Sequence, residues 1–497
     1  MEDKKKITFH ISRFDTCRDE ETGPRLKDYT VYVHDGARVL DVLIAVRDEL
    51  DPTLSFRYCC GAGQCGSCAV LINKKPGLAC MTEAKDGMTI EPLDLPVIKD
   101  LVVDLGAFLK NMPGLVSSEN AELPSKENID KIKPIRDCIE CLCCVSVCPA
   151  MDVADFEGPA LMRQEMRLAL DPRDKRDRIP LCVEEEGLFT CTSCQACWKA
   201  CPKHIEIPGK AIEKLRELAN KEGLTLPRHK EVAELVKTTG RSVERHEEAL
   251  MEMIPEVIEP YGEVKKEVGF FVGCLYNLRL PKTALDAIEV LKRNGIRIIV
   301  PKEQVCCGSP LLRTGQASYV PELMKKNIEC FEKRGIKTVM TMCAGCGSTL
   351  KNNYGGKPFR VVDINELLTE TGIEVPEKLD VRVTYHDPCH LMRGQDITSQ
   401  PRELLKMVAG EFIEMPAKCC GSGGGVKSGL PDEAKALGEE RSKEIDKTGC
   451  DVVITSCPFC ETHIQSCTEK PVKNINSLLL EGYKKKDEMM NKSLNKK

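Results

Sequence analysis

The hydrophobic positions of the chain divide it into an N-terminal part with mixed patterns and a C-terminal part with a regular one. Residues 7–11 and 29–33 alternate between apolar and polar side chains, which predicts two strands. Residues 37–50 place apolar side chains at helical spacing, and residues 69–80 have the pattern of a hairpin that turns at the sequence KPG. We therefore expect a small mixed domain over residues 1–100.

The middle of the chain carries few strand signals. Residues 101–215 hold two dense groups of cysteines, which predicts a helical domain built around metal clusters. Residues 216–266 are charged, have apolar side chains at helical spacing and contain no cysteine. We interpret residues 216–266 as a helical connector.

From residue 267 onward, short apolar runs alternate with amphipathic helical stretches. Such alternation predicts βαβ units, in which right-handed crossovers place the strands in parallel. The pattern of residues 267–368 is repeated over residues 381–480, because VGFFVGC, VCCGSPL and TVMTMCAGC are matched in order by VRVTYHDPC, KCCGSGG and VVITSCPFC. This duplication predicts two copies of one α/β unit.

The most informative feature of the composition is the number of cysteines. The 497 residues include 29 cysteines, which stand in tight local groups, whereas the disulfide scaffold of a secreted protein is short with cysteines throughout. The first ten residues lack the apolar segment of a signal peptide, and no run of 18 apolar residues occurs. We therefore expect metal-bound thiols in a cytoplasmic protein without an integral membrane segment. The formal net charge of -5 gives no sign of nucleic-acid binding.

The first cysteine group has the spacing of a plant-type ferredoxin. Four residues separate Cys60 from Cys65, two separate Cys65 from Cys68, and Cys80 follows later. This is the ligand pattern of one [2Fe–2S] cluster, and the glycines between the cysteines let the backbone wrap closely around it. Structural or zinc-binding cysteines are the alternative interpretation.

Two further groups have the bacterial ferredoxin pattern, in which two, two and three residues separate four cysteines and a proline follows the last. The fourth cysteine of each group ligates the cluster of the other group. One [4Fe–4S] cubane cluster is therefore expected to take Cys138, Cys141, Cys144 and Cys201. The other is expected to take Cys191, Cys194, Cys197 and Cys148.

The duplicated half adds two sets of five cysteines, each made of a lone cysteine, a CCG pair and a CxxC motif. The first set is Cys274, Cys306, Cys307, Cys343 and Cys346, and the second set is Cys389, Cys419, Cys420, Cys457 and Cys460. The lone cysteine precedes the pair by 32 residues in the first set and by 30 in the second. Each set follows predicted strands, where open α/β sheets place their sites. Because zinc takes four ligands, five cysteines favour a larger iron–sulfur cluster.

The chain from about residue 7 to residue 215 resembles the iron–sulfur subunit of succinate dehydrogenases and fumarate reductases. The segments SFRYCCGAGQCGSCAVLI, TIEPLDLPVIKDLVVDL and CIECLCCVSVCP carry this resemblance. It implies a β-grasp ferredoxin domain followed by a helical domain with two cubane clusters. That family commonly has a [3Fe–4S] third centre, with another residue where Cys194 stands, so Cys194 indicates a complete [4Fe–4S] cluster here.

The C-terminal half resembles the catalytic subunit of heterodisulfide reductases, whose paired CCG motifs hold two non-cubane [4Fe–4S] clusters. The two halves in one chain resemble the B subunit of the thiol:fumarate reductases of methanogenic archaea. This resemblance implies a multidomain α+β oxidoreductase subunit with a duplicated α/β CCG domain, which oxidises coenzyme M and coenzyme B to their heterodisulfide. The ten cysteines of the two sets are then catalytic as well as metal-binding. A separate flavoprotein subunit with FAD would reduce fumarate to succinate, because this chain offers no flavin site.

Coenzyme M carries a sulfonate and coenzyme B a phosphate, so the thiol pocket is expected to contain cations. The basic residues that flank the CCG elements are Arg313, Arg393, Lys418 and Lys427. Ordinary surface bases are the alternative interpretation of each. His386 and His390 bracket Cys389, and they are candidates for proton transfer or for packing beside the cluster.

Three other functions fit parts of the sequence. A quinone reductase module at a membrane surface would need an exposed amphipathic helix, and no convincing one is evident. An electron-transfer subunit without thiol chemistry would pass electrons to or from a separate heterodisulfide- or quinone-linked enzyme. A zinc-rich interaction scaffold would contain no iron.

Overall fold

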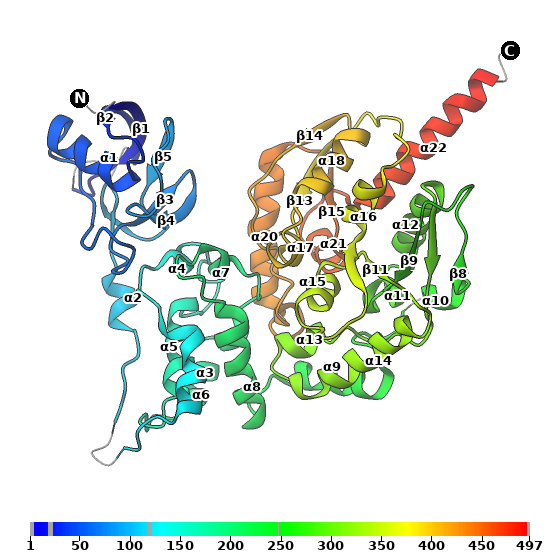
Figure 1. The fold of residues 1–497 in the computed structure, drawn as a ribbon, viewed down its shortest axis with the longest axis horizontal. Coiled ribbons are helices and arrows are strands. Elements are labelled where there is room, and N and C mark those ends of the chain that lie inside the picture. The colour runs from blue at the N-terminus through cyan, green and yellow to red at the C-terminus, as the bar shows by residue number, and fades with distance from the viewer. Residues whose placement is uncertain (1–3, 18–22, 118–120, 247, 495–497) are drawn as a thin grey trace. The chain divides into compact units, whose positions relative to one another are not determined.

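The computed structural model describes residues 4–17, 23–117, 121–246 and 248–494 (Figure 1). The chain forms two compact units, of which the first comprises Met1–Leu188 and Gln195–Leu215. The second comprises Arg216–Lys497 together with the short segment Phe189–Cys194. Among the helices of the described residues, none combines the length and the apolar character that a membrane span requires.

A mixed five-stranded sheet forms the N-terminal part of the first unit. Its strands are β1 Lys5–Arg13, β2 Arg25–Val33, β3 Ala69–Ile72, β4 Lys75–Leu78 and β5 Met88–Glu91. The spatial order is β2-β1-β5-β3-β4, in which β1 and β5 run parallel and the other neighbours antiparallel. Helix α1 Val39–Ala45, extended by a π-helical turn, buries Val39, Val42 and Leu43 in the core of this sheet.

The rest of the first unit is mainly helical. Its elements are β6 Val97–Lys99, β7 Val102–Val103, α2 Gly106–Lys110, α3 Lys126–Arg136, α4 Cys143–Ser146, α5 Pro159–Ala169, α6 Arg178–Glu184 and α7 Ala196–Ala200. A buried ion pair joins α5 to α6, because Arg178 lies 3.2 Å from Glu165 and 2.7 Å from Asp174. Helix α8 Glu213–Lys221 continues from this unit into the second.

The second unit contains two sheets with the same strand order. The first sheet is built from β8 Val257–Ile258, β9 Lys266–Phe270, β10 Ile296–Ile299, β11 Thr338–Thr341 and β12 Arg360–Asp363. The second is built from β13 Arg382–His386, β14 Glu411–Ile413, β15 Val452–Thr455 and β16 Val472–Asn474. The order β12-β11-β9-β10 corresponds to β16-β15-β13-β14, and all these pairs are parallel. The sequence repeat is therefore also a repeat of topology.

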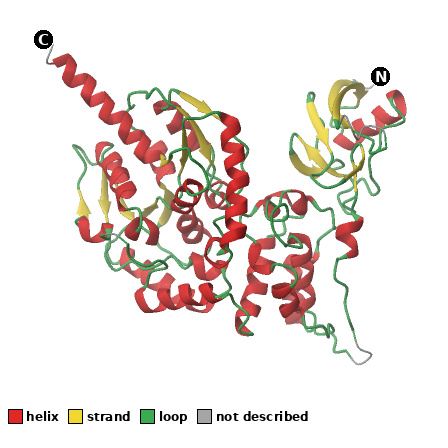
Figure 2. Ribbon diagram, turned by 180° about the vertical axis from the view of Figure 1, so that it is seen from behind, coloured by secondary structure: helices red, strands yellow, loops and turns green. Residues whose placement is uncertain are grey.

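Helices flank the strands of each repeat (Figure 2). In the first repeat they are α11 Cys274–Leu278, α12 Pro281–Arg293, α13 Ser309–Arg313, α14 Val320–Glu332, α15 Ala344–Asn352 and α16 Ile364–Thr371. In the second they are α17 Cys389–Gln395, α18 Ser399–Val408, α19 Val426–Gly429, α20 Pro431–Thr448, α21 Pro458–Gln465 and α22 Ile475–Leu494. Helix α22 packs against α12 and α18 and thereby joins the two repeats.

The segment that the sequence predicts to be a helical connector is built into the second unit. Helices α9 Pro227–Thr239 and α10 Leu250–Met253 pack against helices of the first repeat. Strand β8 adds an antiparallel edge to the first sheet, which the helical pattern did not indicate. The segment is thus partly a structural layer of the first repeat.

The contact of α22 with α12 contains a buried polar link. The hydroxyl of Tyr483 donates to the carbonyl of Glu374 at 2.8 Å and accepts from Nδ2 of Asn294 at 3.1 Å. The side chains of Tyr483 and Asn294 are almost fully buried. Removing one partner therefore leaves polar atoms without hydrogen bonds in a dry contact.

We expect Tyr483→Phe to lower the free energy of unfolding of this contact by about 1–3 kcal/mol, because two buried hydrogen bonds are lost while the ring remains. Hydrogen–deuterium exchange followed by mass spectrometry would show faster exchange in α22 and α12. The strands of the first unit serve as the internal control and should not change. Unaltered exchange in α22 would contradict the stabilising role of the Tyr483 hydroxyl.

Candidate metal centres and the thiol cavity

The loop of the predicted [2Fe–2S] cluster is shaped by glycines and by backbone amides. Gly61, Gly63 and Gly66 have positive φ values of 64°, 68° and 72°, which glycine adopts without steric cost. The amides of Ala62 and Gln64 donate to Sγ of Cys60 at 3.4 and 3.3 Å. Donors of this kind stabilise a negatively charged sulfur ligand.

This loop touches the loop of the first bacterial-type group within the same unit. A Cβ atom on Gly66 would lie 2.5 Å from the carbonyl oxygen of Ile139 and 2.9 Å from Cβ of Cys141. Only glycine permits so close an approach. The two predicted cluster sites are therefore neighbours.

Three of the four cysteines predicted for one cubane cluster surround the fourth. Burial raises the pKa of the Cys144 thiol well above its usual value, and negative charges on Cys141, Cys138 and Cys201, and more weakly on Cys148 of its own group, raise it further. The structure thus brings Cys201 of the second group close to the first group, while the choice between Cys201 and Cys148 as the fourth ligand stays a prediction. The other predicted set is divided between the units, because Cys191 and Cys194 belong to the second unit and Cys148 and Cys197 to the first.

Both bacterial-type groups adopt the same unusual backbone around their second cysteine. Glu140 and Leu142 flank Cys141 with φ values of 52° and 57°. Ser193 and Gln195 flank Cys194 with φ values of 51° and 65°. Positive φ is uncommon outside glycine, so its repetition at equivalent positions indicates a shared functional constraint.

In the duplicated half, the strands and helices place each set of cysteines at the carboxyl ends of the parallel strands. Cys274 begins α11 after β9, and Cys389 begins α17 after β13. Cys343 and Cys457 occupy the N-cap positions of α15 and α21. Helix N-termini favour negative charge, and a thiolate at this position is stabilised.

All ten of these cysteines line one cavity of about 730 Å³. Sγ of Cys420 lies 3.6 Å from Sγ of Cys460 within the second set. The two sets meet in the cavity, because the thiol of Cys343 in the first set contacts that of Cys457 in the second. This contact and the one with Cys346 lower the pKa of the Cys343 thiol. Clustered thiols of this number, most of them buried, fit iron–sulfur clusters, whose irons take thiolate ligands.

Segment Phe189–Cys194 lies against the second set. The thiol of Cys194 interacts with those of Cys389 and Cys419. Sγ of Cys419 lies 3.4 Å from Oγ1 of Thr192, to which it donates. A ligand predicted for a cubane cluster therefore adjoins the cysteines of the second CCG set.

Arg216 holds this segment in place. Its fully buried guanidinium donates to the carbonyl oxygens of Cys191 at 2.8 Å, Gly424 at 2.9 Å and Arg313 at 2.7 Å. One side chain thus joins the cubane loop to both CCG repeats. Gly424 must be glycine, because a Cβ atom there would lie 2.4 Å from the carbonyl oxygen of Cys191.

The structure separates the four basic candidates of the sequence. Arg313 and Lys427 line the cavity. Arg393 does not line it in the described part of the chain, but donates to the carbonyls of Cys194 and Ala417. Lys418 points away, since its side chain is 61% exposed and lies 3.6 Å from Glu444.

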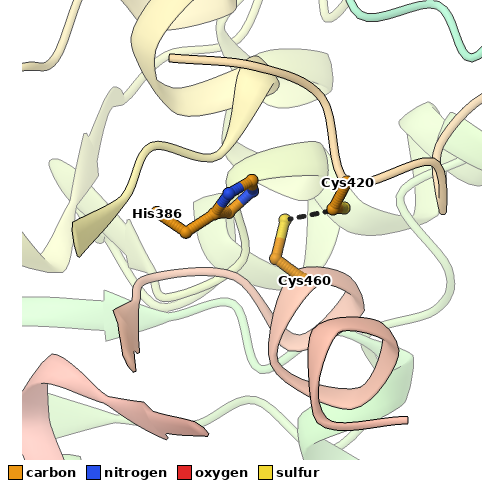
Figure 3. Close-up of side chains that lie close together, drawn as sticks. All are labelled: His386, Cys420 and Cys460. Atoms are coloured by element: carbon orange, nitrogen blue, oxygen red, sulfur yellow. Dashed lines mark hydrogen bonds between the residues drawn. The ribbon is translucent and has the colours of Figure 1, made fainter. Parts of the chain in front are cut away.

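The two histidines beside Cys389 also differ. His390 lines the cavity, and burial lowers its pKa to about 4. Its Nε2 lies 3.0 Å from the carbonyl oxygen of Ser193, to which it donates, so Nδ1 keeps a lone pair. His386 is fully buried, outside the residues found to line the cavity, and lies close to Cys420 and Cys460 (Figure 3).

The sequence did not indicate the cavity residues that come from the predicted connector. Arg228 and His229 on α9 line the cavity, as do residues 242–244. The amide of Ser242 donates to Sγ of Cys274 at 3.4 Å. These residues belong to no metal-ligand motif, and the packing of α9 against α13 and α19 is what reveals them.

Comparisons with known proteins agree with this arrangement. Residues 8–110 match the model of the 2Fe-2S iron-sulfur cluster binding domain, and residues 134–205 match that of the 4Fe-4S dicluster domain. Residues 268–351 and 383–465 each match the cysteine-rich domain. A solved structure of a hypothetical protein from Helicobacter pylori shares the fold, with a TM-score of 0.59 at 15% identity, covering 96% of this chain and 95% of that one.

Two curated relatives cover much of the chain. The D subunit of the dihydromethanophenazine:CoB–CoM heterodisulfide reductase of Methanosarcina barkeri is 31% identical over 66% of this chain and 87% of its own length. The B subunit of the fumarate reductase (CoM/CoB) of Methanothermobacter marburgensis is 40% identical over 96% of this chain and 99% of its own length. The chain therefore belongs to the family of fumarate reductase (CoM/CoB) B subunits and is an iron–sulfur oxidoreductase subunit.

Proposed function

We propose that this chain oxidises two thiols, coenzyme M and coenzyme B, to their heterodisulfide and passes the electrons to a flavoprotein that reduces fumarate to succinate. The observation that carries this proposal is the gathering of all ten CCG cysteines around one cavity. Joining two thiols releases two electrons and two protons, and reducing fumarate consumes both. Two adjacent one-electron centres in one cavity suit a reaction that must take one electron from each thiol.

The proposed cofactors follow the cysteine sets. They are one [2Fe–2S] cluster, two cubane [4Fe–4S] clusters and two non-cubane [4Fe–4S] clusters, carried by a β-grasp ferredoxin domain, a helical two-cluster domain and the duplicated α/β CCG domain. When bound, the non-cubane clusters would supply the one-electron steps of thiol oxidation. The close approach of Gly66 to Cys141 supports a path from the cubane clusters to the [2Fe–2S] cluster. FAD would be held by the partner flavoprotein.

Residues of the cavity would bind and orient the two thiols. The cavity already contains Arg313 and Lys427, whose positive charges suit the sulfonate of one thiol and the phosphate of the other. Lys427 is half-buried, and no acidic side chain forms an ion pair with it within the described ranges. His390 lines the cavity, and its Nδ1 would serve as a hydrogen-bond acceptor for a thiol proton.

Fumarate reduction by the anaerobically purified complex of this chain with its flavoprotein tests the proposal. We expect succinate formation with coenzyme M and coenzyme B together, and none with either thiol alone, because the disulfide needs both. A reduced viologen serves as the control donor. Activity with viologen but none with the thiol pair would leave the chain as an electron-transfer subunit without thiol chemistry.

The role of Lys427 is tested by Lys427→Met, with Lys418→Met as the matched control. We expect Lys427→Met to raise KM for one of the two thiols about tenfold or more, since a partly buried charge-assisted contact contributes about 1.5–3 kcal/mol. The viologen-dependent rate should stay unchanged in both variants. Equal effects of the two substitutions on KM would contradict the assignment of Lys427 to the thiol cavity.

A further inference from the structure

The two repeats differ in the residue that stands three positions before the lone cysteine. Strand register pairs Phe270 with Met340 in the first repeat and Tyr385 with Ile454 in the second. The residues that follow, Phe271 and His386, therefore occupy equivalent positions. Each lies at the end of the strand that leads to the lone cysteine of its set.

In the first repeat this position is part of an apolar wall. The ring of Phe271 lies 6.3 Å from that of Phe331 on α14, measured between ring centroids. Both side chains are fully buried. Neither ring offers a charge or an N–H group to a neighbouring sulfur.

In the second repeat the same wall is polar. Helix α20 occupies the place of α14 between the CCG pair and the next strand, and its Arg441 donates from Nε to Nδ1 of His386 at 3.1 Å. Both side chains are at least 99% buried. An aromatic pair at the first site is thus replaced by a histidine–arginine pair at the second.

The hydrogen bond from Arg441 fixes the tautomer of His386. Because Nδ1 accepts a hydrogen bond from Nε of Arg441, the ring proton of the neutral histidine lies on Nε2. Nε2 is buried and has no hydrogen-bond partner among the described residues. A ring nitrogen of His386 and Sγ of Cys420 and Cys460 all lie within 4.8 Å of one another (Figure 3). The ring of His386 thus carries an unpartnered Nε2–H donor and lies beside two cluster ligands.

Arg441 brings a buried positive charge to the same place. Its Nη1 donates to the carbonyl oxygen of Pro416 at 2.7 Å, and no carboxylate pairs with it in the part of the chain that the structure describes. Nearby Asp387 is bound by both terminal nitrogens of Arg402, at 2.9 and 2.8 Å. A buried cation without a counter-charge is costly, so an anionic group must compensate it.

Sulfur ligands of the second set are the anionic groups that act most strongly on Arg441, ahead of the carboxylates of Asp387 and Glu444. Burial lowers the pKa of Arg441, and negative charges on Cys420 and Cys389 oppose this shift. An iron–sulfur site with thiolate ligands becomes more negative when it is reduced. A fixed positive charge and an N–H donor therefore stabilise its reduced form.

We propose that His386 and Arg441 keep the second CCG site easier to reduce than the first and thereby make it the exit for electrons. This inference rests on the proposed function of the two sets as cluster sites. A site that could accept these electrons lies beside the second set, because the thiol of Cys194, a predicted cubane ligand, interacts with Cys389 and Cys419. At the first site Arg241 acts on Cys274, and its side chain is partly exposed, unlike that of Arg441.

A redox titration followed by electron paramagnetic resonance (EPR), on the complete anaerobic chain with mediators and without thiols, tests the proposal. Cys274→Ser identifies the signal of the first site by its loss or change. We expect the second site to have the higher midpoint potential. His386→Phe and Arg441→Met should each lower that potential and leave the potential of the first site unchanged.

Matched variants distinguish an effect on the midpoint potential of the second site from a general loss of packing around it. Tyr385→Phe changes the preceding buried residue, whose hydroxyl lies 3.2 Å from Oγ of Ser456, and should move neither potential. Arg441→Lys keeps the charge and should retain most of the wild-type potential, even if Arg441→Met loses the second cluster. Loss of that cluster from both Arg441 variants, or an unchanged potential in His386→Phe and Arg441→Met, would overturn the proposal. Because no thiol is present, these results do not depend on whether the chain oxidises thiols.

Discussion

The need to bring five thiols from three separate loops to one point determines the architecture of the second unit. No single loop supplies a set, because the lone cysteine, the CCG pair and the CxxC motif follow different strands. Parallel strands bring these loops together, since their carboxyl ends lie at one edge of the sheet. Duplication of the unit then brings two such edges to one cavity, where Cys343 of the first set meets Cys457 of the second.

Gathering so many sulfurs creates a second constraint, which is negative charge in a dry interior. Three kinds of group stabilise this negative charge. They are the helix N-termini at Cys343 and Cys457, backbone amides, and buried arginines. Arg216 shows that such a cation also has a mechanical role, because it ties three carbonyl oxygens together. Arg441 instead donates to His386 and Pro416, and its charge acts on the sulfurs of Cys420 and Cys389. The distribution of buried cations therefore distinguishes the two CCG sites, although their cysteines are equivalent.

The cysteine sets could be predicted from the sequence, because the spacing of metal ligands is a local property of the chain. Sequence reasoning also found the duplication, which the matching strand orders of the two sheets confirm. It could not separate Lys427 from Lys418, because both lie near the same CCG pair and only the course of the loop decides which enters the cavity. It missed Arg228 on α9, since a charged helix without a motif looks like a connector until its packing is known. The contact of His386 with Arg441 on α20 likewise needed the packing of the second repeat.

The presence of two cluster sites in one cavity is tested most directly by anomalous diffraction at the iron absorption edge, from crystals of the anaerobically purified chain. We expect two separate iron clusters in the cavity of the second unit, one enclosed by the five cysteines of each set. We also expect the cluster of the second set to lie next to His386. Single metal ions at the two sets, or iron at only one of them, would contradict this arrangement.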